Sequence, residues 1–363
     1  MATISLPQQH DPRQQPHSGS EVIIGVDTHK DIHVVAILST TGALLATSSF
    51  AATLAGYEEL LEWVCSHGEP SVAGVEGTGS WGAGLTQALR REGIAVIEVN
   101  RPDRSMRRRH GKTDAVDAEA AARAVLSGHA TVTPKSHDGQ VEAMRLYKLA
   151  KDSAVKARTQ ATNQLKAVLV NGDPLLREEL AGKTTHAQVM HCLTLSYDDP
   201  DPVQVARHRT LRMLAERIRH LCSEIRELEK LLTAAVAQTA PRLLDLFGVG
   251  HDSAATLLIA AGDNADRLSG EAAFAALCGV NPVERSSGQT QRRRLNRGGN
   301  RQANAALFRI ALTRLRADPR TRAYVQRRTT EGKTKREILR CLKRYIAREI
   351  FGIVRAIVPP NVA

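Results

Sequence analysis

The sequence lacks any long hydrophobic run. No apolar stretch approaches the roughly 20 residues that a transmembrane helix needs. The first twenty residues are rich in Gln, His, Pro and Ser and lack the apolar core of a signal peptide. We therefore expect a soluble, cytoplasmic protein with no membrane partner and a disordered tail over residues 1–20.

Cysteine is scarce and scattered. The chain has no C-x-x-C pair and no His next to a Cys at metal-ligand spacing. This pattern excludes a zinc site and a disulfide scaffold, and it indicates reduced thiols. The five cysteines are Cys65, Cys192, Cys222, Cys278 and Cys341.

Negative charge is nearly missing from one segment. Residues 284–348 contain 20 Lys and Arg but only 4 Asp and Glu, and since the whole chain carries +12, the remainder is slightly acidic. One-sided basic charge is typical of a nucleic-acid partner. A merely solvated basic surface or a membrane-facing patch would also be basic, but the segment is mostly Arg and lacks the Trp/Phe-rich face of an interfacial helix.

A chain of 363 residues exceeds what one hydrophobic core usually supports, so we expect two or three units. Residues 21–52 predict three closely spaced, hence antiparallel, strands. Alternating helices and strands follow, which predicts a mixed α/β sheet. The expected strands are 21–27, 32–39, 43–50, 71–76 and 94–99, and the expected helices are 54–64, 81–91 and 114–126.

A long helical region follows. Residues 141–170 and those from about 203 onward have helical periodicity, and seven apolar residues alternate spacings of three and four, as in a coiled-coil seam. The partner of this seam is either another subunit or a helix of the same chain. We interpret residues 173–202, rich in Pro, Gly and Asp, as an irregular connection. The seam is formed by Leu211, Leu214, Ile218, Leu221, Ile225, Leu228 and Leu232.

The last third is predicted to be helical. Residues 243–247, the turn Gly248-Val249-Gly250 and residues 253–261 resemble a helix-hairpin-helix, although an ordinary tight helical turn explains them as well. A short helix over 271–277, a polar loop over 284–300, and two basic helices over 301–316 and 335–358 follow.

Four carboxylates are expected to converge. Asp27 and Glu76 each end a strand, and Asp114 and Asp117 lie three apart on one helix face. Because such a cluster repels itself, it needs a divalent cation or stays partly protonated. Oxygen ligands suit Mg²⁺ or Mn²⁺, which catalyse phosphoryl transfer. Taken singly, Asp27 could be a turn residue and Asp114 a helix cap.

Basic residues next to these carboxylates suggest where a phosphodiester lies. The segment MRRRHGK contributes Arg107, Arg108, Arg109 and Lys112. A solvated loop is the alternative explanation. In the polar loop, Ser286 and Ser287 precede Gly288, and by local sequence alone they are turn residues.

Longer motifs resemble a known family. GVDTHKD, VEGTGSWG, RPDR and GKTDAVDAEAAARA are similar to the N-terminal DEDD domain of transposases of the insertion-sequence-110 family. LCGVNP, SSGQTQRRRLNRGGNRQANAAL and RTTEGKTKREILRCLKRYIARE are similar to its C-terminal domain. The resemblance covers nearly all of residues 21–350. Where the family often has Pro before the G-x-G turn, this chain has Phe247.

The resemblance implies a mechanism. The first domain would have an RNase H-like, RuvC-type fold in which Asp27, Glu76, Asp114 and Asp117 bind Mg²⁺. Ser287, or failing that Ser286, would attack DNA and form a phosphoserine, in a composite site with the carboxylates of another subunit. A structured guide RNA would select the element ends and the target DNA. The expected nucleic-acid contacts in the last third are Arg292, Arg293, Arg294, Arg297 and Arg301.

These expectations define a domain plan, an oligomeric state and two alternative functions. The plan is a tail over 1–20, a RuvC-like catalytic domain over 21–135, a coiled-coil region over 136–236 and a basic helical domain with the serine motif over 237–363. The seam predicts a homodimer, and recombination of two duplexes would favour a homotetramer. The alternatives are a RuvC-like structure-specific endonuclease that does not use Ser287, and a non-catalytic nucleic-acid-binding scaffold.

Overall fold

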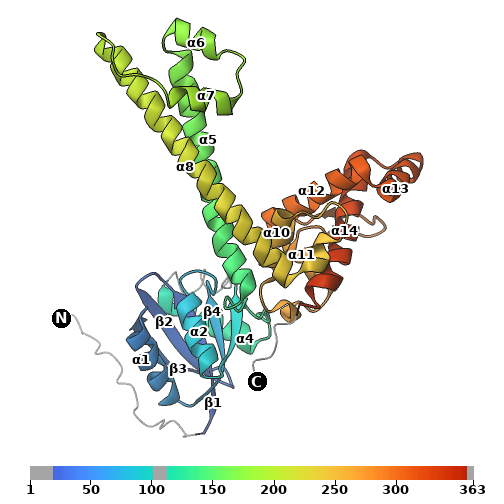
Figure 1. The fold of residues 1–363 in the computed structure, drawn as a ribbon. Helices are drawn as coiled ribbons and strands as arrows, with labels where there is room; N and C mark the ends of the chain where they lie inside the picture. The colour runs from blue at the N-terminus through green and yellow to red at the C-terminus, as the bar shows by residue number, and fades with distance from the viewer. Residues whose placement is uncertain (1–18, 101–112, 358–363) are drawn as a thin grey trace, which may run out of the picture. The chain divides into compact units, whose positions relative to one another are not determined.

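The computed structural model describes residues 19–100 and 113–357. The chain divides into two compact units, residues 1–136 and 137–363, and each is treated separately below. Figure 1 shows an α/β unit followed by a helical one. None of the helices in the described ranges combines the length and apolar character needed to span a membrane.

The first unit contains the mixed sheet that the sequence predicts. The five strands have the order β3-β2-β1-β4-β5. The pairs β1–β2 and β2–β3 are antiparallel, and β1–β4 and β4–β5 are parallel. The strands are β1 (Glu21–Thr28), β2 (Ile32–Ser39), β3 (Leu44–Ala51), β4 (Glu69–Glu76) and β5 (Ala95–Val99).

Helices cover both faces of this sheet. Because side chains alternate along a strand, Val22, Ile24 and Val26 of β1 pack on one side with α1 (Leu54–Cys65) and α2 (Ala83–Arg91). Ile23 lies on the other side, in a small core with Ala122 of α4 (Asp114–Leu126). The central strand β1 is therefore buried on both faces, which explains its nearly continuous apolar sequence.

One titratable side chain lies inside the first core. His33 of β2 is fully buried, and its ring stacks on Tyr57 with centroids 5.8 Å apart. Burial lowers the pKa of His33 below its usual value of 6.5, and the nearby His29 lowers it further, against a smaller opposing effect of the Ile32 backbone. The folded unit therefore favours the neutral imidazole.

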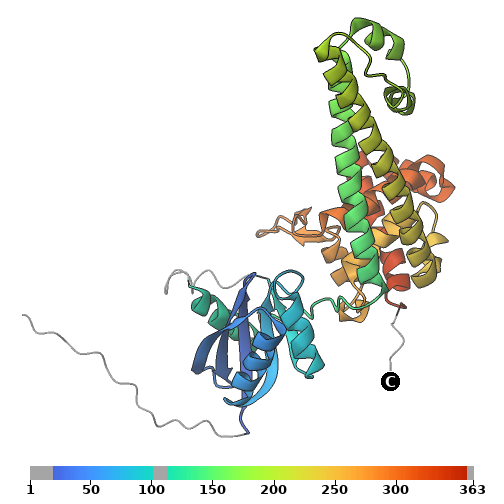
Figure 2. The same cartoon turned by 60° about the vertical axis from the view of Figure 1, so that its left-hand side comes forward.

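The second unit begins with a long antiparallel helical hairpin (Figures 1 and 2). Helix α5 (Gln140–Val170) packs along α8 (Pro202–Thr239), which contains the predicted seam. The partner of the seam is thus a helix of the same chain. Every second seam residue is buried, namely Leu211, Ile218, Ile225 and Leu232, whereas Leu214, Leu221 and Leu228 are only half-buried.

The connection between these helices is not irregular throughout, although its composition predicts an irregular segment. It contains α6 (Pro174–Leu180) and α7 (Thr185–Cys192), which begin at the side-chain caps Asp173 and Thr184. Leu176, Leu180 and Val189 pack against the α5–α8 hairpin in one apolar cluster. Asp173, Pro174, Asp201 and Pro202, which indicated an irregular segment, are therefore helix-start residues.

The rest of this unit is a bundle of helices with one large core. Its last basic helix ends at Val354, earlier than predicted, and a further helix over Pro319–Thr330 was not predicted between the two basic helices. The turn Gly248-Val249-Gly250 packs against α12, since a Cβ on Gly248 would lie 3.3 Å from the carbonyl of Ile310. The elements are α9 (Pro241–Leu244), α10 (His251–Ala261), the 3₁₀ helix η1 (Ala265–Arg267), α11 (Glu271–Leu277), α12 (Arg301–Ala317), α13 (Pro319–Thr330) and α14 (Lys335–Val354).

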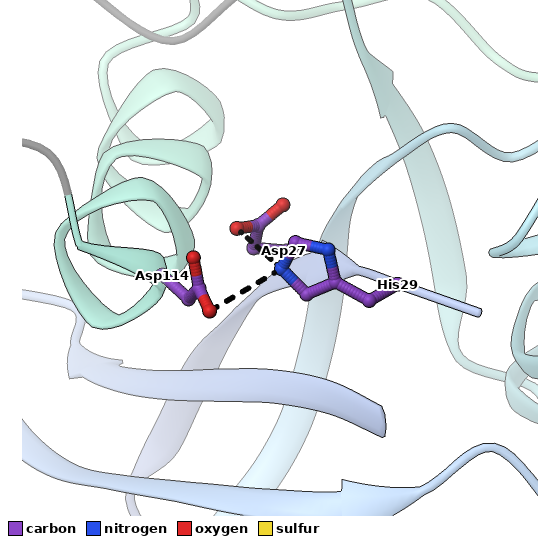
Figure 3. Close-up of side chains that lie close together, drawn as sticks. All are labelled: Asp27, His29 and Asp114. Atoms are coloured by element: carbon purple, nitrogen blue, oxygen red, sulfur yellow. Dashed lines mark ion pairs between the residues drawn. The ribbon is translucent and has the colours of Figure 1, made fainter. Parts of the chain in front are cut away.

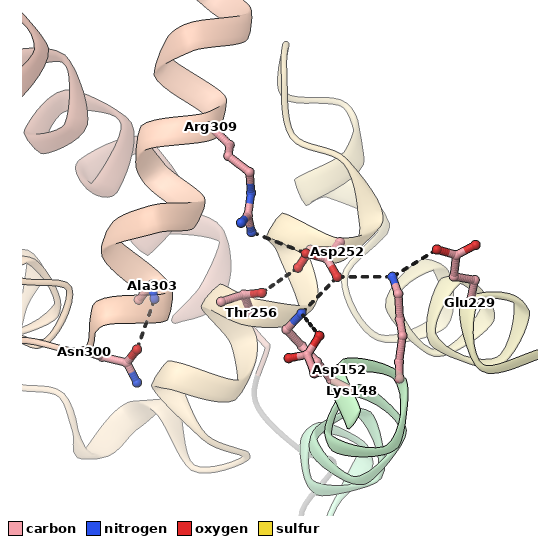
Figure 4. A network of polar contacts seen from close by, with 9 residues as sticks. Lys148, Asp152, Glu229, Asp252, Thr256, Asn300, Ala303 and Arg309 are labelled. Atoms are coloured by element: carbon pink, nitrogen blue, oxygen red, sulfur yellow. Dashed lines mark hydrogen bonds and ion pairs between the residues drawn. The ribbon is translucent and has the colours of Figure 1, made fainter. Parts of the chain in front are cut away.

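Charged side chains join the hairpin to this bundle (Figure 4). Asp252 of α10 accepts from Lys148 of α5 at 2.9 Å and also lies 3.3 Å from Lys151 and from Arg309 of α12. Burial opposes ionisation of Asp252, but Lys148 and Lys151 outweigh it and lower its pKa. Lys148 is itself buried, so Asp252 supplies the counter-charge that makes its burial tolerable.

The cysteines are all free thiols, which agrees with the reduced state that their scatter indicates. Burial raises the pKa of Cys278 to about 12 and that of Cys192 to about 11. Neither side chain is therefore a thiolate nucleophile near neutral pH.

Candidate active site

Two strand ends bring predicted carboxylates onto one face of the sheet. Asp27 of β1 and Glu76 of β4 directly follow the paired residues Val26 and Val75 on adjacent parallel strands. The hydroxyl of Thr28 donates to the backbone carbonyl of Glu76 at 2.8 Å, which joins the two strand ends. By strand alternation, both carboxylates lie on the face that α4 covers.

Two glycines allow α4 to lie directly on that face. Gly25 and Gly74 are register partners on β1 and β4. A Cβ on Gly25 would lie 2.1 Å from the carbonyl oxygen of Ala118, and one on Gly74 would lie 2.8 Å from that of Ala121. The helix backbone therefore occupies the space where side chains would normally stand, and this close packing brings the first turn of α4 to the strand ends.

The first turn of α4 carries the other two predicted carboxylates. Its N-cap is Thr113, whose hydroxyl accepts from the amide of Val116 at 3.3 Å. Asp114 is thus not the cap, and its side chain is exposed, whereas Asp117 is only 3% exposed. The helix dipole favours carboxylates at this end.

A histidine joins this group, and the residue-by-residue prediction missed it. The Nε2 atom of His29 lies 3.4 Å from an oxygen of Asp27 and 3.4 Å from an oxygen of Asp114. In Figure 3 the three side chains point toward one another from β1, the loop after it and α4. Their ligand atoms lie within 4.8 Å of each other, which makes these three residues a candidate metal group in the described part of the chain.

The donors of this group suit a divalent cation. Asp27 is buried and Asp114 is exposed, so a cation bound here would neutralise two carboxylates while staying in reach of solvent. Asp117 and Glu76 lie on the same face of the sheet but outside the three-residue group. The signal for His29 was present in the sequence, because it lies two residues after Asp27 within the GVDTHKD motif.

The predicted serines lie on a short hairpin in the second unit. We call residues 282–295 the serine hairpin; it consists of β6 (Pro282–Glu284), β7 (Arg293–Leu295) and the loop between them. The predicted polar loop thus contains two strands. Figure 2 shows this orange segment projecting from the helices of its unit.

The two serines have different environments. The hydroxyl of Ser286 donates to Glu284 and accepts from the backbone amide of Arg292 at 3.2 Å. Ser287 closes the turn through backbone hydrogen bonds with Thr290, both 3.1 Å. Its hydroxyl has no hydrogen bond to any residue in the described ranges, so Ser286 stabilises the hairpin and the Ser287 hydroxyl remains available.

The base of the serine hairpin is anchored by small and amide residues. A Cβ on Gly299 would lie 2.2 Å from the backbone nitrogen of Gly279, so these two backbones meet directly. The amide of Asn296 donates to the Ala276 carbonyl at 3.0 Å, and that of Asn304 donates to the carbonyls of Cys278 and Gly279. The Gly and Asn residues of the LCGVNP and NRGGN segments therefore hold the hairpin in place.

The predicted nucleic-acid-binding arginines of this unit are exposed. All five lie on or next to the serine hairpin, namely Arg292, Arg293, Arg294, Arg297 and Arg301. The other predicted set, Arg107, Arg108, Arg109 and Lys112, lies outside the described residues.

Comparison with known families gives two matches in chain order. A family model described as a transposase of the DEDD IS110 type matches residues 24–174, and a second, described as the transposase IS116/IS110/IS902 family, matches residues 240–326. The first match contains all four predicted carboxylates, and the second contains the serine hairpin.

Individual relatives agree with these matches. The chain is 25% identical, over 86% of its length and 88% of the relative's, to a mini-circle protein of Streptomyces coelicolor assigned as the transposase for IS117. It is 32% identical to the transposase for insertion sequence element IS1328 of Yersinia enterocolitica, over 49% of this chain and 51% of the relative. An uncharacterised 43.6 kDa protein of insertion element IS110 from Streptomyces coelicolor is 35% identical over 32% of this chain and 29% of that protein.

Proposed function

The chain belongs to the IS110 family of transposases, and on that premise we propose that it moves an insertion sequence by a carboxylate-and-serine mechanism. Membership implies DNA binding, cleavage and rejoining in general. Our proposal assigns the metal-binding tetrad to Asp27, Glu76, Asp114 and Asp117, and the nucleophile to Ser287.

The observation that supports the tetrad most strongly is the meeting of Asp27 and Asp114. Their side chains come from β1 and α4, and both lie 3.4 Å from His29 Nε2. The sheet order and the helix on each face are compatible with an RNase H-like, RuvC-type fold, which we propose for this unit. Glu76 and Asp117 complete the set from the same face of the sheet.

We assign Mg²⁺ or Mn²⁺ to this site, because carboxylate oxygens are the ligands that these ions prefer. Such an ion, when bound, would neutralise the negative charge that develops during phosphoryl transfer. Asp27 and Asp114 would hold it, with His29 next to both. The buried Asp117 and the half-buried Glu76 would complete the oxygen ligands of the tetrad.

The serine hairpin would supply the covalent step. The Ser287 oxygen attacks the phosphorus, its proton passes to solvent, and the bond to the departing sugar oxygen breaks as that oxygen takes up a proton. Rejoining reverses the step, because a DNA hydroxyl attacks the phosphoserine and the serine regains its proton. Ser286 is the weaker candidate, since its hydroxyl is already hydrogen-bonded within the hairpin.

The proposal extends to partners. The carboxylates of one subunit would act with the serine of another, in a homodimer or homotetramer. The exposed arginines Arg292, Arg293, Arg294, Arg297 and Arg301 would contact DNA and a structured guide RNA. Arg107, Arg108, Arg109 and Lys112 would contact DNA beside the carboxylates.

A covalent-trapping experiment tests this mechanism. Purified protein, Mg²⁺, element-end DNA and the transcript of the flanking region are mixed, denatured and separated to detect protein linked to DNA. We expect a linked species that Ser287→Ala and Asp27→Ala abolish and that Ser286→Ala retains.

The controls separate the competing functions. Cleaved DNA without linked protein, unaffected by Ser287→Ala, would leave a metal-dependent endonuclease of the RuvC-like kind. Binding without cleavage under all conditions would leave a nucleic-acid-binding scaffold. Omitting the transcript shows whether RNA guidance operates, independently of the serine.

A further inference from the structure

A pocket of about 410 Å³ lies between the serine hairpin and α14 in the second unit. This volume is within the roughly 300–1,000 Å³ of typical small-ligand sites. Among the described residues that line it, none is acidic. The cationic lining residues are Arg293 and Arg294 of the hairpin, and Arg340, Lys343, Arg344 and Arg348 of α14.

The cations of α14 share one helix face. Arg340, Arg344 and Arg348 are four residues apart, and Lys343 lies three residues after Arg340, so their side chains are neighbours. Like charges at this spacing repel each other and destabilise a helix. Such a row is therefore best explained by an anion that binds next to it.

One carboxylate of the bundle offsets part of this charge. Glu271 of α11 accepts from Arg344 at 3.0 Å and from Arg348 at 2.7 Å. The Nη1 atom of Arg344 is nevertheless buried with no hydrogen-bond partner in the described ranges. An unsatisfied charged donor is costly, so Glu271 does not use the full hydrogen-bonding capacity of the Arg344 guanidinium.

Arg293 lies 3.8 Å from Glu284 of the hairpin, but three further cations of the pocket form no ion pair with a described residue. Within the part of the chain that the structure describes, no carboxylate lies within 4.0 Å of Arg294, Arg340 or Lys343. Lys343 is held by Asn304, whose side-chain oxygen accepts from its ammonium at 2.8 Å. Burial, and then the charge of Arg340, lower the pKa of Lys343. The pocket thus retains a positive potential that an anion would neutralise.

An aromatic ring stands beside these charges. Tyr345 lines the pocket and is 51% exposed, and its ring meets that of Tyr324 edge to face at 5.8 Å. Proteins that bind single-stranded nucleic acid combine basic grooves for the backbone with aromatic side chains on which bases stack. This pocket contains both components side by side.

We propose that the pocket binds one phosphodiester of a single-stranded nucleic acid segment, with the adjacent base on Tyr345. The inference rests on the proposed function and specifies a site within it. Because Arg293 and Arg294 belong to the serine hairpin, a strand in this pocket contacts the hairpin a few residues from Ser287. The strand is either unpaired DNA or an unpaired part of the guide RNA, which share this chemistry.

Equilibrium binding tests the pocket without catalysis. The full chain, in EDTA, is titrated with labelled 12-nucleotide oligo-dT and oligo-U, and the anisotropy is followed at several salt concentrations. We expect Arg340→Gln/Lys343→Gln to weaken binding on the order of tenfold and to reduce the salt slope by about 0.7 for each phosphate that the variant no longer neutralises. We expect Tyr345→Leu to weaken binding on the order of tenfold and Tyr345→Phe to retain affinity.

The matched control is Arg217→Gln/Arg219→Gln, which removes two exposed charges from α8, outside the basic segment. The inference is overturned if this control loses as much affinity as the pocket pair, or if the pocket pair weakens binding to duplex DNA but not to single strands. A larger effect on oligo-U or on oligo-dT identifies the strand as RNA or DNA. Thermal melts of every variant identify a loss that comes from misfolding.

Failure of this inference is distinguishable from failure of the proposed function. The titration needs neither metal nor Ser287, so it can succeed although no protein–DNA linkage ever forms. Conversely, the pocket variants could bind the oligonucleotides with unchanged affinity and still form the Ser287-dependent linkage at wild-type yield. That result would overturn the pocket and retain the mechanism.

Discussion

At the residue scale, His29 and His33 show how position decides the role of a side chain. They are four residues apart, at opposite sides of the β1–β2 turn. His29 is half-exposed and lies between two carboxylates, whereas His33 is buried against Tyr57. Of these two histidines, His29 can reach a metal ion, and His33 makes the first core sensitive to protonation.

His33 predicts a pH dependence of folding. Its pKa in the folded chain lies below the usual 6.5, so the unfolded chain binds a proton more readily. The contribution of neutral His33 to the free energy of unfolding is therefore fully present above about pH 6.5. It is lost as the pH falls from there through the lowered pKa, by at most about 1.4 kcal/mol for each pH unit. Urea unfolding monitored by tryptophan fluorescence should detect this loss of stability, because Trp63 and Trp81 both lie in the first unit.

His33→Phe keeps a ring against Tyr57 and should remove this loss between pH 7 and 5. The exposed His129 provides the control, since His129→Asn should lose stability between pH 7 and 5 as the wild-type chain does. An unchanged pH dependence in His33→Phe would show that another group is responsible.

At the element scale, the position of α4 decides the acidic site. The helix is rich in alanine, and its backbone lies against Gly25 and Gly74 without intervening side chains. An ordinary separation between helix and sheet would move Asp114 away from Asp27. The small residues of the two motifs are therefore as necessary to the site as the carboxylates.

Gly25→Ala should disturb this packing, because the added methyl group would lie 2.1 Å from the Ala118 carbonyl. We expect a loss of about 1–3 kcal/mol in the free energy of unfolding, as for overpacked cores, together with weaker Mn²⁺ binding by calorimetry. Gly352→Ala is the control, since a Cβ there meets nothing within 4 Å in the interior of α14. Wild-type Mn²⁺ affinity in Gly25→Ala would contradict the dependence of the site on α4.

The α5–α8 hairpin makes a second point at this scale. Four of the seven seam residues are buried, but Leu214, Leu221 and Leu228 are not fully covered. Pairing within the chain therefore does not use the whole seam. The same periodicity is compatible with a further helix from another subunit.

At the scale of the whole molecule, basic charge is concentrated in residues 284–348, whereas the predicted carboxylates all lie in the first unit. Because the proposed mechanism exchanges strands between two duplexes, we expect more than one subunit to take part. The domain plan and the homodimer or homotetramer remain predictions.

Light scattering after size exclusion should find a dimer or tetramer at micromolar concentration. Replacing Leu214, Leu221 and Leu228 together by Ser should raise the dissociation constant at least about tenfold while the helical circular dichroism is retained. Met213→Ser, on an exposed position of α8, is the control. A monomeric wild-type chain would contradict the prediction.

The sequence by itself determined the five strands, the long helices, the apolar seam, the basic segment and the family. These depend on periodicity, charge and contiguous motifs, which are local properties of the chain. It also predicted that four carboxylates converge, because strand ends and the first turn of a helix can be recognised from sequence patterns. Of these four, Asp27 and Asp114 meet at His29 in the structure.

Only the tertiary structure decided which groups meet. The addition of His29 to the acidic site and the packing of α4 on Gly25 and Gly74 depend on residues brought together from distant positions. The sequence did not determine the partner of the seam, because a heptad pattern fits a helix of the same chain as well as a helix of another subunit. The pocket beneath the serine hairpin was likewise hidden, since it combines β7 with α14, and its counter-charge Glu271 comes from α11. Such contacts depend on packing between elements, which periodicity along the chain does not specify.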